Sequence, residues 1–128
     1  MSAVTGEVRV MRLLGLFGAG RIINPLTARS QLIGGMTMGL SAALFEDSVI
    51  DPRFGNVVNN DLAGYHIAAH ADVVDIRAKW IDEFDPYFGP TGAKGIGELG
   101  IVRRARSHRQ RHLQRDRKAA AQPAVFAR

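Results

Sequence analysis

The sequence has no cysteine among its 128 residues. A disulfide framework, a thiolate metal site and an iron–sulfur cluster are therefore excluded within this chain. No apolar run approaches the ~20 residues that a membrane-spanning helix needs, so we expect no membrane partner. The opening residues, MSAVTGEVRV, contain no basic segment followed by an apolar one, and they do not have the pattern of a secretory signal.

Acidic residues are almost absent from the last part of the chain. Residues 1–102 hold 8 Lys and Arg against 11 Asp and Glu, whereas residues 103–128 hold 9 against 1. The net charge of +5 therefore combines a mildly acidic body with a strongly basic tail. We expect residues 1–102 to form the folded part and residues 103–128 to be disordered or irregular.

Apolar and alternating stretches predict an α+β fold. Residues 4–20 have strand character, and residues 26–46 carry apolar side chains three and four apart, as is typical of a helix. Residues 46–67 predict a hairpin with its turn near Asp51-Pro52 and Gly55. Alternating apolar side chains in residues 72–82 predict one more strand. Mixed strands with one long helix are typical of the α+β class.

The predicted helix contains three glycines, Gly34, Gly35 and Gly39. Each glycine costs about 1 kcal/mol relative to alanine in a helix interior. Such a helix is favoured only where a neighbour lies close to its backbone. Tight packing against another part of the chain and room for a ligand are both compatible with this pattern.

The stretch Gly92–Gly100, GAKGIGELG, places four glycines around Lys94 and Glu98. The phosphate-binding loop pattern requires Ser or Thr after the lysine, and Gly95 stands there instead; the dinucleotide-binding pattern is only approximated. Glu98 is a candidate general base, because flanking glycines let the backbone approach a bulky ligand. The structural alternative is a first-turn glutamate of a helix that begins in the apolar segment Leu99–Val102.

Other polar residues predict no chemistry. His66 and His70 are four residues apart, but no third metal ligand follows at a suitable spacing. Asp82, Glu83 and Asp85 are predicted to form a solvated acidic loop.

Three blocks of sequence occur in a distinctive order: GRIINPLTARSQLIGGMTMGLSAALFED, NNDLAGYHIAAHADVVDI and GAKGIGELGIV. In this order and spacing they resemble the large subunit of molybdenum hydroxylases, the xanthine dehydrogenase and aldehyde oxidase family. The resemblance covers about residues 4–102. It implies that the chain is a C-terminal fragment with an incomplete part of the family's molybdenum-cofactor-binding domain.

The resemblance implies roles for five residues. Glu98 matches the general base at the molybdenum centre, and Gln31 matches a glutamine that binds the pterin. Gly95, Ile96 and Gly97 match backbone that runs close to the metal. The resemblance implies no direct protein ligand to the metal, which the pterin dithiolene holds. The implied reaction is the hydroxylation of aldehydes or N-heterocycles with oxygen derived from water.

The implied cofactor is the molybdenum cofactor, as molybdopterin or its cytosine dinucleotide form. The family also implies partner subunits that carry a 2Fe-2S centre and FAD. The cytoplasm is the default location, and a periplasmic complex exported on a partner's signal is the alternative. Because most cofactor contacts of the family lie upstream, this chain alone is expected to be inactive.

The sequence departs from the family pattern at several positions. Ala68 stands where the family usually has proline, and Asp72-Val73-Val74 replaces D-V-P. Basic residues follow Val102, where the family has a glycine- and alanine-rich helix. Reading each codon from Arg103 one nucleotide later permits a family-like ending, so we hypothesise a one-nucleotide insertion. The alternative is a small basic protein that binds nucleic acid or an acidic partner through residues 103–128.

Overall fold

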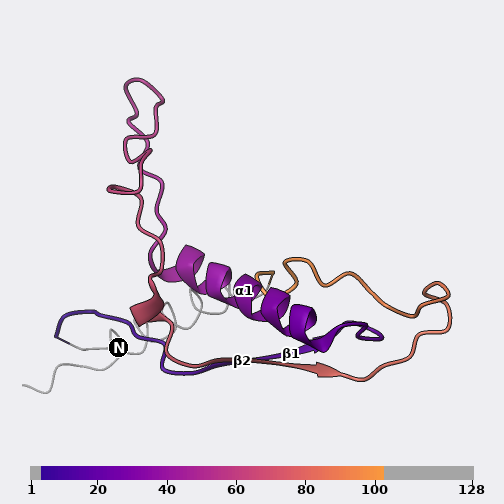
Figure 1. Cartoon of the computed structure of the whole chain (residues 1–128). Helices are drawn as coiled ribbons and strands as arrows, with labels where there is room; N and C mark the ends of the chain where they lie inside the picture. Colours follow the sequence, from indigo (N-terminus) through magenta and orange to yellow (C-terminus); the bar gives the residue numbers. More distant parts are fainter. Residues whose placement is uncertain (1–3, 103–128) are drawn as a thin grey trace, which may run out of the picture.

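A computed structural model describes residues 4–102 of the chain (Figure 1). Its elements are β1 (Leu13–Gly18), α1 (Pro25–Leu44), the short 3-10 helix η1 (His70–Asp72) and β2 (Ile76–Ile81). β1 and β2 pair in parallel, and α1 lies along the strand pair in Figure 1. A parallel pair needs such a crossover connection between its strands. The predicted α+β class is confirmed, while the predictions for residues 103–128 lie outside the described residues.

The helix α1 begins at a strong N-terminal cap. The side-chain Oδ1 of Asn24 accepts hydrogen bonds from the backbone N–H groups of Leu26, at 3.0 Å, and Thr27, at 3.3 Å. Pro25 occupies the first helical turn, where its missing N–H is not needed. The observed helix ends at Leu44, so the predicted helix over residues 26–46 is confirmed within two residues.

The hydrophobic core lies between α1 and the strand pair. Its buried members come from all three elements: Leu13, Leu32, Met36 and Ala78. Ile96 and Leu99 of the glycine-rich stretch pack against this cluster as partly buried neighbours. The stretch that carries the predicted base is therefore attached to the same core as the helix.

The strand pairing is shorter than the sequence predicts. β1 begins at Leu13, whereas strand character in the sequence begins near Val8 and Val10. Residues before Leu13 find no partner strand within the described part of the chain, because the β1–β2 register starts at Leu13 opposite Ile76. Because strand structure requires backbone pairing, β1 begins only where β2 is available.

A long irregular arm, residues 46–69, connects α1 to η1 and rises away from the helix in Figure 1. The predicted hairpin within it is reduced to one antiparallel bridge, between Ile50 and Val57, with Gly55 in the left-handed region at φ 72°. The arm returns to the helix end, where Ala68 N–H donates to the hydroxyl of buried Ser41 at 2.9 Å. A proline at position 68 could not make this hydrogen bond.

No helix within residues 4–102 is both long enough and apolar enough to cross a membrane.

Candidate functional site

The glycine-rich stretch enters the fold beside the end of β1. Gly20 and Ala93 form an antiparallel bridge. Arg21 N–H donates to the Gly92 carbonyl at 2.9 Å, and Lys94 N–H donates to the Ala19 carbonyl at 3.1 Å. These backbone bonds fix where the stretch Gly95–Glu98 begins.

A cavity of about 340 Å³ lies between the helix and this stretch. Of the residues predicted for the site, Gln31 and Ile96 line it. Gln31 is exposed on α1, and Ile96 lies 65 positions later in the chain. The other described residues that line the cavity are Arg21, Ile23, Asn24, Thr27, Ala28, Ala93 and Lys94. Glu98, Gly95 and Gly97 are not among the lining residues, so the structure brings together only part of the predicted set.

Gly95 and Gly97 stand in open space. A Cβ added to either residue would meet no described heavy atom within 4 Å, and neither has a left-handed backbone. The described chain therefore requires glycine at neither position for its own conformation or packing. Side-chain-free backbone here leaves room for a group that approaches from outside.

Glu98 has an unusual backbone. Its φ is 55°, and it is the only non-glycine residue with positive φ among residues 4–102. This left-handed region is costly for residues with a Cβ and is often occupied at functional sites. The side chain is exposed, and Ile101 N–H donates to the Glu98 carbonyl at 3.0 Å in a turn. The prediction of a helix beginning at Leu99 is wrong for residues 99–102, which form turns.

Gly100 and Gly35 allow the glycine-rich stretch Gly92–Gly100 to pack closely against the backbone of α1. A Cβ on Gly100 would lie 2.5 Å from the Leu32 carbonyl oxygen and 2.7 Å from the Met36 nitrogen. A Cβ on Gly35 would lie 3.1 Å from the Gly100 backbone, whereas one on Gly34 would meet nothing within 4 Å. Tight packing therefore explains Gly35, one of the two alternatives that the sequence left open, but it does not explain Gly34.

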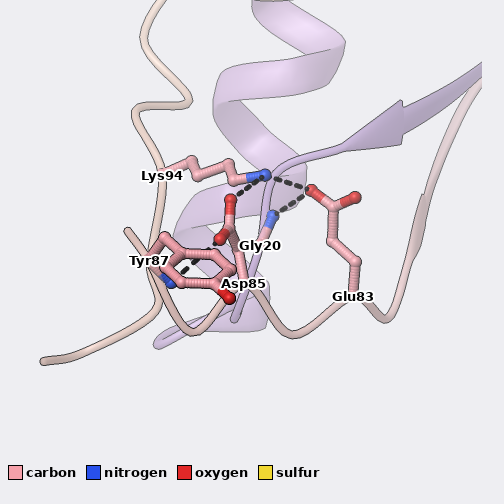
Figure 2. Close-up of polar contacts among 5 residues, drawn as sticks. All are labelled: Gly20, Glu83, Asp85, Tyr87 and Lys94. Atoms are coloured by element: carbon pink, nitrogen blue, oxygen red, sulfur yellow. Dashed lines mark hydrogen bonds and ion pairs between the residues drawn. The ribbon is translucent and has the colours of Figure 1, made fainter. Parts of the chain in front are cut away.

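Lys94 is held by two carboxylates that follow β2 (Figure 2). Its Nζ lies 3.1 Å from Glu83 Oε1 and 3.4 Å from Asp85 Oδ2. Glu83 Oε1 also accepts a hydrogen bond from Gly20 N–H at 2.9 Å. The prediction of a solvated acidic loop is therefore wrong for Glu83 and Asp85, although Asp82 is exposed. Sequence reasoning missed this cluster because its partners lie 9 and 11 residues apart without regular structure between them.

We expect the ion pair between Lys94 and Glu83 to stabilise the fold only at pH values at which Glu83 is ionised and Lys94 is protonated. The hydrogen bond from Lys94, followed by the one from Gly20, lowers the pKa of Glu83 below its ordinary value of 4.5. The hydrogen bond to Glu83, and to a smaller extent that to Asp85, raises the pKa of Lys94 above its ordinary value of 10.5. The Glu83 contribution to folding is fully present above pH 4.5 and is lost as the pH falls through its lowered pKa. The Lys94 contribution is lost as the pH rises through its raised pKa.

A carboxyl-carbon NMR titration of Glu83 in the wild type and in Lys94→Met measures this coupling. We expect a lower midpoint in the wild type and a return toward the ordinary value in the variant. Equal midpoints in the two proteins would contradict the ion pair.

The histidines do not share a helix face. His66 lies in the arm and His70 begins η1, and both are exposed. Within residues 4–102, no group of three or more His, Asp or Glu side chains is placed to hold a metal ion.

Arg21 also lines a second cavity, of about 430 Å³. Its remaining lining residues are Gly20, Ile22, Pro25, Trp80, Asp82, Glu83 and Phe84. The sequence analysis did not single out Arg21, and the only signal for it was its place in the block that begins GRIINP.

A family model described as the molybdopterin cofactor-binding domain matches residues 2–74. The chain is 52% identical over 99 residues to the aldehyde oxidoreductase molybdenum-binding subunit PaoC of Escherichia coli K12. It is 34% identical over 96 residues to the xanthine dehydrogenase molybdenum-binding subunit of Escherichia coli O157:H7. These matches cover 77% and 75% of this chain but only 14% and 13% of the relatives, so the chain spans about one seventh of their length.

Solved structures agree with these relatives. The fold matches quinoline 2-oxidoreductase from Pseudomonas putida 86 with a TM-score of 0.71 and 30% identity, over 84% of this chain and 15% of that one. It matches a Cu,Mo-CO dehydrogenase with a TM-score of 0.71 and 26% identity, over 77% of this chain and 12% of that one.

Proposed function

The chain belongs to the molybdopterin cofactor-binding domain family of molybdenum oxidoreductases, and on this premise we propose that residues 4–102 form one wall of a hydroxylase active site. The observation that carries the proposal is the cavity where Gln31 of α1 faces Ile96 of the glycine-rich stretch. The family's cofactor is the molybdenum cofactor, and the sequence analysis predicted the same group.

The residues present fit such a cofactor. The backbone at Gly95 and Gly97 is open, because a Cβ added to either residue would meet no described heavy atom within 4 Å. Bulky ligands make close contact with backbone where side chains are absent. Gln31, exposed on the cavity wall, offers an amide that can both donate and accept hydrogen bonds to a pterin ring. We propose that Gln31 binds the pterin part of the cofactor and that the backbone of Gly95, Ile96 and Gly97 runs close to the metal centre.

Glu98 is proposed as the general base. When bound, the cofactor would supply the two-electron redox chemistry of the hydroxylation. The contribution of this chain would be a carboxylate that accepts a proton from the water-derived oxygen nucleophile. The left-handed backbone at Glu98 supports this role, because strain of this kind is retained where function requires a particular side-chain direction.

The substrates proposed are aldehydes or N-heterocycles, and the partners proposed are an iron–sulfur subunit and an FAD subunit. The cofactor form, whether molybdopterin or its cytosine dinucleotide, belongs to the same proposal. Because the match covers only 14% of the relative's length, we propose that this chain alone does not turn over substrate. Turnover requires the remaining walls of the site.

The substitution Gly97→Ala tests whether the open backbone serves the cofactor. The substitution is made both in the isolated chain and in a chimaera. The chimaera is the Escherichia coli K12 aldehyde oxidoreductase molybdenum-binding subunit with its matched segment replaced by residues 4–102 of this chain. In the isolated 128-residue chain, urea unfolding should show no loss of stability, and a gain of up to about 1 kcal/mol from reduced chain entropy. In the chimaera, molybdenum content measured by mass spectrometry should fall severalfold.

Gly34→Ala is the comparison variant: it also adds a Cβ into open space but on the helix, and it tests whether room for a ligand explains that glycine. It should leave the molybdenum content unchanged. Full molybdenum occupancy in Gly97→Ala would remove the argument that this glycine makes room for the cofactor.

A further inference from the structure

Lys94 joins three segments that are distant in the sequence. Its backbone is bonded to Ala19 at the end of β1, and its side chain reaches Glu83 and Asp85 beyond β2. Residue 95 begins the open glycine stretch directly afterwards. We propose that Lys94 is a positioning residue, which holds the stretch Gly95–Glu98 against the strand ends through Glu83 and Asp85 and does not bind an anionic ligand. The consequence for the cofactor rests on the proposed function, whereas the positioning role does not.

One carboxylate oxygen makes the central connection. Glu83 Oε1 accepts from Gly20 N–H at 2.9 Å and from Lys94 Nζ at 3.1 Å, as Figure 2 shows. It therefore joins the chain after β1 to the glycine stretch. Asp85 is itself oriented, because its Oδ1 accepts from Tyr87 N–H at 3.1 Å while its Oδ2 faces Lys94 at 3.4 Å. Both carboxylates are thus preorganised by backbone donors before they meet the ammonium group.

The charges argue against a free cation at Lys94. Two carboxylates face one ammonium group, so the cluster carries a net charge of about −1 when all three groups are ionised. The lysine has three donors, and the two carboxylates already occupy two of them. Phe88 lies under the same ammonium group, with Nζ 5.9 Å from its ring centroid. An anion that approached Lys94 would meet a cluster whose net charge is already negative.

Lys94 lines the 340 Å³ cavity together with Gln31 and Ile96. Its side chain is 30% exposed, and its backbone lies where the glycine-rich stretch leaves the strand ends. Losing the cluster would let this stretch move relative to α1. Holding Lys94 would therefore fix the distance across the cavity between Gln31 on α1 and Ile96 on the glycine-rich stretch.

Native-state hydrogen exchange on the full 128-residue chain tests the positioning role. The variants are Lys94→Met, Glu83→Gln, the double variant and Lys94→Arg, with exposed Lys79→Met as a charge-matched control. We expect exchange at Gly20, Lys94 and Ile101 to rise about threefold or more in each single variant, as for loss of a local ion-pair network. The rise in the double variant should be smaller than the sum of the two single effects, because both substitutions remove the contact between Lys94 and Glu83.

Two further results complete the test. Lys94→Arg should restore most of the protection, and Lys79→Met should leave it unchanged. Exchange of the α1 amides reports global folding, so it identifies any variant that unfolds. If a Lys94 variant unfolds, the result for Glu83→Gln decides the test. Unchanged exchange in Glu83→Gln, or effects that add in the double variant, would overturn the proposal.

Inorganic pyrophosphate distinguishes positioning from anion binding. With 13C-labelled wild-type chain, we expect no change in the Glu83 titration midpoint at millimolar pyrophosphate. A midpoint that returns to its ordinary value on adding pyrophosphate would show that an anion displaces Glu83, and would overturn the proposal. Failure of the chimaera to hold molybdenum would instead count against the proposed function, and it would leave the exchange results unaffected.

Discussion

Replacing Glu98 by glutamine in the chimaera is expected to lower kcat about 10²–10⁴-fold, the usual contribution of a general base. Molybdenum content should stay equal to that of the unsubstituted chimaera. The physical reason is that glutamine keeps the shape and hydrogen-bonding length of the side chain but cannot accept a proton in the relevant pH range. Steady-state turnover of an aldehyde and metal analysis of the same sample measure the two quantities together.

Two matched variants separate catalysis from structure at this position. Glu7→Gln removes another exposed carboxylate and should leave turnover unchanged. Glu98→Gly should remove turnover and at the same time raise the free energy of unfolding of the 128-residue chain, because left-handed backbone costs a non-glycine residue about 1 kcal/mol or more. Loss of molybdenum in Glu98→Gln would assign the residue a structural role and would contradict the base.

Replacing Gly100 by alanine is expected to destabilise the 128-residue chain by about 1–3 kcal/mol, the usual cost of forcing extra atoms into a packed site. The new Cβ would stand 2.5 Å from the Leu32 carbonyl oxygen and 2.7 Å from the Met36 nitrogen. Both atoms belong to the backbone of α1, so neither can rotate away as a side chain would. Urea unfolding followed by circular dichroism measures the change.

Gly34→Ala is the control for this substitution, because the same helix there faces open space. It should stabilise the chain by about 0.5–1 kcal/mol, since glycine is the weaker helix former. A Gly35→Ala substitution meets Gly100 at 3.1 Å and should not add fully to Gly100→Ala, because the two changes disturb one contact. A Gly100→Ala chain as stable as the wild type would show that the stretch is not docked on α1.

Local patterns predicted the elements well where periodic burial decides the structure. The helix was predicted at residues 26–46 and observed at Pro25–Leu44, with the cap at Asn24 setting its start. The alternation in residues 72–82 appears in β2, where Ala78 is buried between exposed Arg77 and Lys79. Short-range spacing suffices for these features because each side chain's environment follows from its neighbours in the same element.

Long-range pairing could not be predicted from local patterns. β1 and β2 are parallel partners, with Leu13 opposite Ile76, and nothing in either strand specifies the other. The Lys94 cluster and the contact of Gly100 with Gly35 likewise join residues that are distant in the sequence, so local patterns do not predict them. The family resemblance predicts which residues belong to the site but not where they lie. The structure adds that Gln31 and Ile96 line one cavity.

The resemblance also left one local departure unexplained. Ala68 replaces a proline that the family usually carries, and the sequence alone gave no reason for the change. In the structure, the N–H that alanine provides donates to Ser41, a buried hydroxyl on α1 that is only 6% exposed. A buried hydroxyl without a hydrogen-bond partner is destabilising, and the Ala68 N–H supplies a partner to Ser41 that a proline would not.

The molybdenum-to-protein ratio of the purified chimaera tests the central claim most directly, namely that residues 4–102 form one wall of a molybdenum-cofactor site. We expect the same ratio as in the unmodified Escherichia coli subunit, and a severalfold lower ratio when Gly97 is replaced by alanine. A folded chimaera, assembled with its partners but free of molybdenum, would contradict the proposal that residues 4–102 form part of the cofactor site.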